Sequence, residues 1–123
     1  MNWKKIRLEL AVAPGFPSGS VSRGYLIRLP LNANGSVDFG ALSQAPQRAT
    51  VRRFWSSDPD ESGRVGSVGA ERLTLELNGS RVLAVRPSSF KTGGGVTLVG
   101  SDGSSLPFRV ASIHEVATTE QRL

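Results

Sequence analysis

The sequence predicts a small, mainly β single domain: a barrel or sandwich of about six or seven short antiparallel strands with at most one short helix. Two observations predict it. Short runs of alternating apolar and polar residues recur along the chain, with Gly, Ser, Asn and Asp clustered between them, and no window of a dozen residues carries the stripe of an amphipathic helix. A length of 123 residues suits one domain with its own core. We expect this domain to span residues 1–116, followed by a polar tail over 117–123.

The first expected strand lies close to the N-terminus. Four apolar residues alternate there with polar ones, and a period of two places them on one face of a strand. They are Ile6, Leu8, Leu10 and Val12. We therefore expect these four side chains in the core.

A second strand is expected over residues 25–31, and Pro30 suggests that its end lies at a sheet edge, since proline cannot donate a ladder hydrogen bond. The short helix is expected to follow. Asp38 is suited to cap its N-terminus, and Pro46 would end it.

The segment 50–55 reads Thr-Val-Arg-Arg-Phe-Trp and is predicted to be a third strand, because β-branched and aromatic residues dominate its apolar positions. Residues 56–63 are polar and acidic and are expected to form a loop. Only a short, weak strand is expected over residues 65–68.

Two hairpins complete the predicted fold. Residues 72–85 alternate on both sides of an Asn-Gly pair at 78–79, which is typical of a two-residue type I′ turn. That register pairs apolar residues with apolar residues and sets Glu76 opposite Arg81, so opposite charges meet. A second hairpin is expected over residues 96–113.

Composition limits the classes of function. The net charge is +5 with a pI of about 10.7, which fits nucleic-acid binding but fits an ordinary arginine-rich soluble protein better. The chain has no cysteine, which excludes disulfides and thiolate metal sites. The N-terminus has the basic start of a signal peptide, but Arg7 and Glu9 break the apolar run that should follow. No apolar stretch approaches about 18 residues, so we expect a cytoplasmic protein without a membrane span.

No residue pattern indicates catalysis, a cofactor or a metal. His114 is the only histidine, and no candidate nucleophile accompanies it, so we interpret it as a surface residue. Asp58, Asp60 and Glu61 could offer oxygen ligands, but a calcium site needs about six to eight, which favours a solvated acidic turn. The glycines at 93–95 precede a predicted strand and not the helix that a phosphate loop requires.

The segment 48–55 is the one candidate binding surface. Guanidinium groups bind phosphate bidentately and aromatic rings stack on bases, which makes these side chains candidates for polyanion binding. The candidates are Arg48, Arg52, Arg53 and Trp55. Because strand residues alternate, Arg53 and Trp55 share one face, and one of the two aromatics in the segment is expected in the core. An exposed strand with one buried aromatic is the favoured interpretation.

We therefore expect a small domain that acts by binding and not by catalysis, with another protein or a second copy of itself as partner. An exposed edge at residues 25–31 would suit such a partner. The alternative is a small barrel that binds nucleic acid or a nucleotide. That function requires the arginines to converge on one face beside an exposed aromatic.

Overall fold

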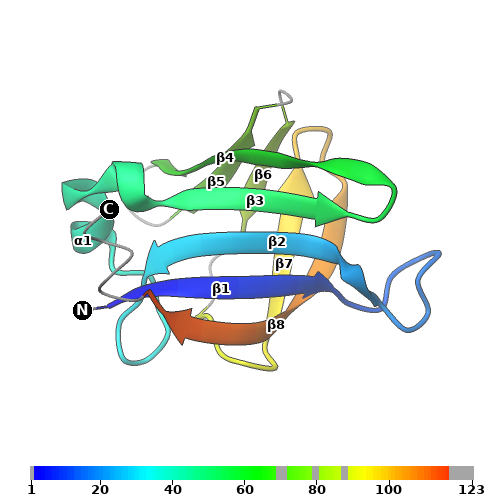
Figure 1. Cartoon of the computed structure of the whole chain (residues 1–123), viewed down its shortest axis with the longest axis horizontal. Helices are drawn as coiled ribbons and strands as arrows, with labels where there is room; N and C mark the ends of the chain where they lie inside the picture. Colours follow the sequence, from blue (N-terminus) through cyan, green and yellow to red (C-terminus); the bar gives the residue numbers. More distant parts are fainter. Residues whose placement is uncertain (1, 69–71, 79–80, 87–88, 117–123) are drawn as a thin grey trace.

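The protein forms a closed barrel of eight antiparallel strands in the computed structural model, which describes residues 2–68, 72–78, 81–86 and 89–116 (Figure 1). Each strand pairs with its neighbours in sequence, and the last closes on the first. In chain order the strands are β1 (Trp3–Leu10), β2 (Ser20–Pro30), β3 (Thr50–Trp55), β4 (Asp58–Val68), β5 (Arg72–Leu77), β6 (Arg81–Val85), β7 (Gly95–Gly100) and β8 (Ser105–Glu115). The predicted fold class is confirmed as a barrel, with more strands than expected. The predicted tail, residues 117–123, lies outside the described residues.

Alternation along the strands builds the core. Ile6, Leu8 and Leu10 point inward from β1 and are essentially inaccessible to solvent. The prediction for Val12 was wrong, since β1 ends at Leu10 and Val12 is 67% exposed in the connection to β2. A periodic pattern therefore continued past the point where strand pairing stops.

Closure of the barrel removes the sheet edges. β2 lies between β1 and β3, but β3 pairs only with residues 23–27 of β2, so the end of the strand at Pro30 is paired with β1 alone, as predicted for an edge position. Pro30 is the last residue of β2, where it faces Trp3 and the missing N–H costs little. Residues 25–27 are paired on both sides and offer no edge to a protein partner, whereas residues 28–30 pair with β1 alone.

The predicted helix is confirmed. Oδ1 of Asp38 accepts a hydrogen bond of 3.0 Å from the backbone N–H of Ala41 and caps α1 (Phe39–Gln44). A single 3-10 turn, η1 (Pro46–Arg48), follows. Leu42 of α1 is buried in the core. Of the helices described, none has the length and apolar character to cross a membrane.

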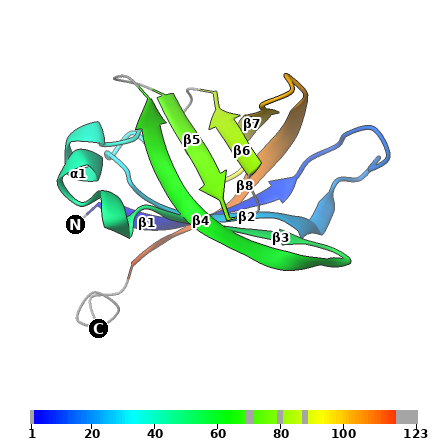
Figure 2. The same cartoon turned by 90° about the horizontal axis from the view of Figure 1, so that it is seen from above.

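The two ends of the barrel differ. In an up-and-down barrel alternate connections lie at opposite ends, so the β1–β2, β3–β4, β5–β6 and β7–β8 connections share one end. The β2–β3 connection, which contains α1, lies at the other end beside the N-terminus (Figures 1 and 2). The helix thus packs at one end and leaves the opposite end to four strand connections.

The acidic segment is strand and not loop. β3 and β4 are joined by a tight turn at Ser56 and Ser57, where Ser57 has a φ of 75°. Residues that were expected to form a loop pair with β3, as Glu61 does with Arg53. Pairing with β3 and β5 overrides the low strand propensity of Asp, Pro and Gly.

The predicted register of the β5–β6 hairpin was wrong by one residue. Leu77 pairs with Arg81 and Leu75 with Leu83, so the connection has three residues and not two. The predicted turn type involves residues 79–80, which lie outside the described residues. Because side chains alternate, the slip moves Arg81 from the outer face, opposite Glu76, to the inner face.

Candidate ligand-binding site

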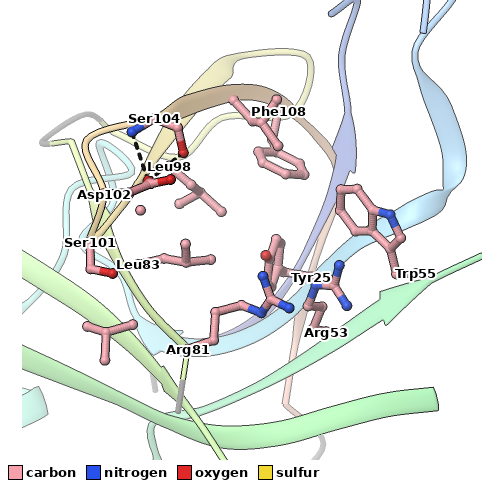
Figure 3. A pocket seen from close by; sticks show the side chains of 13 residues that line it. Tyr25, Arg53, Trp55, Arg81, Leu83, Leu98, Ser101, Asp102, Ser104 and Phe108 are labelled. Atoms are coloured by element: carbon pink, nitrogen blue, oxygen red, sulfur yellow. Dashed lines mark hydrogen bonds between the residues drawn. The ribbon is translucent and has the colours of Figure 1, made fainter. Parts of the chain in front are cut away.

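A pocket of about 550 Å³ opens at the end of the barrel opposite α1 (Figure 3). We call it the mouth pocket. It is lined by Tyr25, Arg53, Trp55, Arg81, Val82, Leu83, Leu98, Gly100, Ser101, Asp102, Ser104, Leu106 and Phe108. Figure 3 shows two sides: leucines and Phe108 on one, and two arginines beside Tyr25 on the other.

The polar side is built by strand pairing. Tyr25 of β2 lies opposite Arg53 of β3, which lies opposite Glu61 of β4. Directly paired residues point to the same face of a sheet, so the three side chains form a row inside the barrel. Arg81 reaches the same space from β6 (Figure 3). A polar layer therefore sits at the end of an otherwise apolar interior.

Arg53 is the most confined charge of this layer, with only 6% of the residue exposed. Its Nη1 lies 3.3 Å from Oε2 of Glu61 and 3.5 Å from Oδ2 of Asp58, and its guanidinium stacks over the Trp55 ring, 4.4 Å from the centroid. These contacts offset the cost of burying a cation. The Nε atom is nevertheless buried without a hydrogen-bond partner among the described residues.

Arg81 is held more loosely. Its side chain is 48% exposed, and its Nε lies 3.6 Å from the same Oε2 of Glu61. Charge-assisted hydrogen bonds to carboxylates are usually about 2.7–2.9 Å long. In the described part of the chain, the Arg81 guanidinium donates no hydrogen bond within that range. Oε2 of Glu61 thus contacts two guanidinium groups, and both contacts are longer than a usual charge-assisted hydrogen bond.

Tyr25 joins the polar and apolar sides. Its ring meets that of Phe108 edge to face, with centroids 5.4 Å apart. Burial raises the pKa of the Tyr25 hydroxyl, and the neighbouring Arg53 opposes the shift only in part. The hydroxyl is therefore protonated at neutral pH and can both donate and accept a hydrogen bond.

The rim of the pocket exposes apolar side chains. Val82 is 44% exposed and Leu106 is 38% exposed. The β7–β8 turn completes the rim, and there Oδ1 of Asp102 accepts hydrogen bonds from the Ser104 hydroxyl (2.7 Å) and N–H (3.0 Å). These bonds lower the pKa of Asp102. The Asp102 carboxylate thus stabilises the β7–β8 turn through these hydrogen bonds.

The candidate residues of the 48–55 segment occupy three places. Arg53 and Trp55 line the mouth pocket. Trp55 packs against the core but is only half-buried, and Phe54 is half-buried as well, so the expectation of one aromatic in the core was wrong: the buried side chains of this strand are Val51 and Arg53. Arg52 lies on the outer face of the barrel, and Arg48 stacks over Trp3, 4.5 Å from the ring centroid. The four therefore do not form one surface.

The outer face gathers other basic residues. Lys5, Arg28 and Arg52 line a shallow depression of about 470 Å³ over β1, β2 and β3. No aromatic residue is among its lining. His114 is exposed on β8, opposite Lys5. Among the described residues, no group of three or more His, Asp or Glu side chains is placed to hold a metal.

Sequence reasoning missed three residues of the polar layer: Tyr25, Glu61 and Arg81. Tyr25 was assigned to an edge strand, Glu61 to a loop, and Arg81 to the outer face. The signal for Arg81 was present, because a three-residue connection also preserves apolar pairing in β5 and β6.

No protein-family model, curated protein or solved structure significantly matches the chain. Its function must therefore be inferred from the geometry of the barrel.

Proposed function

We propose that the protein acts by binding, without catalysis, and that it holds a small amphipathic molecule in the mouth pocket. The observation that supports this most is the pocket itself, an opening of about 550 Å³ with an apolar side and a polar side. Ligand sites usually measure about 300–1,000 Å³ and combine apolar walls with a few polar groups. An eight-stranded barrel is wide enough for its interior to hold one small ligand.

Two further features support a ligand. Arg53 is buried, and its Nε has no hydrogen-bond partner among the described residues, although buried polar groups are normally satisfied. Val82 and Leu106 remain exposed on the rim, where an amphipathic ligand would cover them. A ligand at this place would cover the exposed rim and lie beside the Arg53 side chain, whose Nε is itself shielded from solvent, as is the Nε of Arg23 outside the pocket.

The test uses phenylnaphthylamine, a neutral apolar dye that fluoresces when it leaves water. Leu106→Trp would fill the pocket from its rim. Val21→Trp is the matched control, since Val21 is 64% exposed and does not line the pocket. We expect the dye to bind the unaltered protein, to bind Leu106→Trp at least about tenfold more weakly, a loss of about 1.4 kcal/mol, and to bind the control unchanged. Absence of binding, or equal binding to both variants, would overturn the proposal.

The second candidate function is polyanion binding, which the gathering of Lys5, Arg28 and Arg52 favours. A labelled single-stranded oligonucleotide titrated with the protein measures it by fluorescence anisotropy. Binding should weaken linearly with the logarithm of salt concentration and should weaken uniformly across sequences in Arg52→Ala. A flat response at low salt would exclude this candidate.

A further inference from the structure

We propose that the ligand of the mouth pocket is a small organic anion, a carboxylate or related acid with an apolar body, whose acidic group binds Arg81 and displaces Glu61 from it. This inference rests on the proposed function. It adds the chemical class of the ligand and its orientation.

The hydrogen-bond donors that line the pocket favour an anion. Arg53, Arg81 and Asp102 are the charged lining residues, so cations outnumber carboxylates at the surface a ligand would touch. Asp102 is already bonded to Ser104. Glu61 and Asp58 lie against these guanidinium groups and offset their charge, so the preference for an anion rests on N–H donors that Glu61 contacts only at 3.3 and 3.6 Å, from which an acidic oxygen can accept a hydrogen bond and a cation cannot.

Glu61 is the internal competitor for this position. Its Oε2 lies 3.3 Å from Arg53 and 3.6 Å from Arg81. Arg53 does not depend on Glu61 alone for its position, because Asp58 and the Trp55 ring also contact its guanidinium group. Within the described ranges, Arg81 has only the longer contact with Glu61, so an incoming acid would gain a guanidinium fork whose geometry suits bidentate binding.

The apolar side fixes the orientation. Leu83, Leu98 and Phe108 point into the space that Arg81 faces (Figure 3). A ligand with its acid on Arg81 would lay its apolar body against these side chains and extend toward Leu106 at the rim. The acid therefore sits inside the barrel mouth while part of the body covers the exposed rim.

The test compares two dyes of similar shape, anilinonaphthalene sulfonate, which is an anion, and phenylnaphthylamine, which is neutral. Arg81→Met should weaken binding of the anion about tenfold or more and change binding of the neutral dye less than about twofold. Glu61→Gln should strengthen binding of the anion several-fold and leave the neutral dye unaffected. Arg64→Met is the matched control, because it removes the same charge from an exposed position outside the pocket.

Displacement adds a second readout. Decanoate should displace the anionic dye far better than decanol does. Added salt should weaken binding of the anionic dye and leave binding of the neutral dye unchanged. If Arg81→Met weakens binding of both dyes equally, or if Glu61→Gln leaves the affinity for the anionic dye unchanged, the inference is wrong. Neither result would contradict the proposed function. If neither dye binds the unaltered protein, the proposed function itself fails. Thermal melting of each variant verifies that it is folded.

Discussion

Tyr25 and Arg53 lie directly opposite each other on β2 and β3, and both are buried inside the barrel. Two effects on the Tyr25 pKa oppose each other. Burial disfavours the charged phenolate, whereas the Arg53 cation favours it. Burial has the larger effect, so the pKa of Tyr25 is raised. The balance between the two residues can be measured directly, because the chain has a single tyrosine.

Tyr25 should titrate above the ordinary tyrosine value of about 10, and Arg53→Met should raise its pKa further by removing the cation. The ultraviolet absorbance of tyrosinate against pH measures both. Because the unfolded state loses this proton first, stability should fall as pH rises from about 10 through the higher folded pKa. Titration of Tyr25 at or below its ordinary pKa would contradict the observed burial.

Glu9 should contribute measurably to stability. It is buried on the outer side of β1, where Arg7 Nε (2.8 Å) and Arg109 Nη2 (3.0 Å) donate hydrogen bonds to its two carboxylate oxygens. Glu9→Gln should lower the free energy of unfolding by about 1–3 kcal/mol, since it weakens two charge-assisted bonds. Glu115→Gln is the control, because Glu115 pairs with Lys4 at an exposed position and should have little effect. Denaturant unfolding compares the variants.

The effect of Glu9 should depend on pH in a defined direction. Burial on its own raises the pKa of Glu9, but the hydrogen bonds from Arg7 and Arg109 outweigh it, and the net shift is downward. A lowered folded pKa gives stability that is present above the unfolded value of about 4.3 and is lost as pH falls through the folded value. The difference between Glu9→Gln and the unaltered protein should therefore shrink on acidification. A constant difference down to low pH would show that the charge plays no part.

Gly63 of β4 should tolerate no side chain. A Cβ there would overlap the carbonyl oxygen of Glu76 on β5, so the two strands would have to separate. Gly63→Ala should cost about 2–4 kcal/mol of unfolding free energy. The control is Gly95→Ala at the start of β7, where the nearest atom would lie 3.9 Å from the new Cβ. Equal melting temperatures for the two variants would show that β4 and β5 do not pack as described.

The parts of the fold that were predictable are those that local sequence determines. Alternation over residues 50–55 placed Arg53 and Trp55 on one face, and Asp38 marked the start of α1, because both depend on neighbours in the chain. Residues 56–63 were misassigned because Asp, Pro and Gly have low strand propensity. Their pairing with β3 and β5 comes from tertiary structure, which overrides propensity.

The candidate site could be predicted only in part, for the same reason. Its polar layer joins Tyr25, Arg53, Glu61 and Arg81 from four strands, and their meeting requires both the closed barrel and the correct register. Closure is a non-local property. The register of β5–β6 depends on one residue of turn length, and that residue decides the face on which Arg81 lies.

The β5–β6 register can be tested with introduced cysteines, since the chain has none of its own. Thr74 lies opposite Ala84, whereas a two-residue turn would set it opposite Leu83. Thr74→Cys with Ala84→Cys should form a disulfide on mild oxidation, because directly opposed strand residues lie within the distance that a disulfide spans. Thr74→Cys with Leu83→Cys should stay reduced. Leu83 is next to Ala84 in β6, so its side chain lies on the face of the sheet opposite that of Thr74. Thiol titration before and after oxidation distinguishes the two. The reverse result would move Arg81 to the outer face and remove the structural basis for an anion in the mouth pocket.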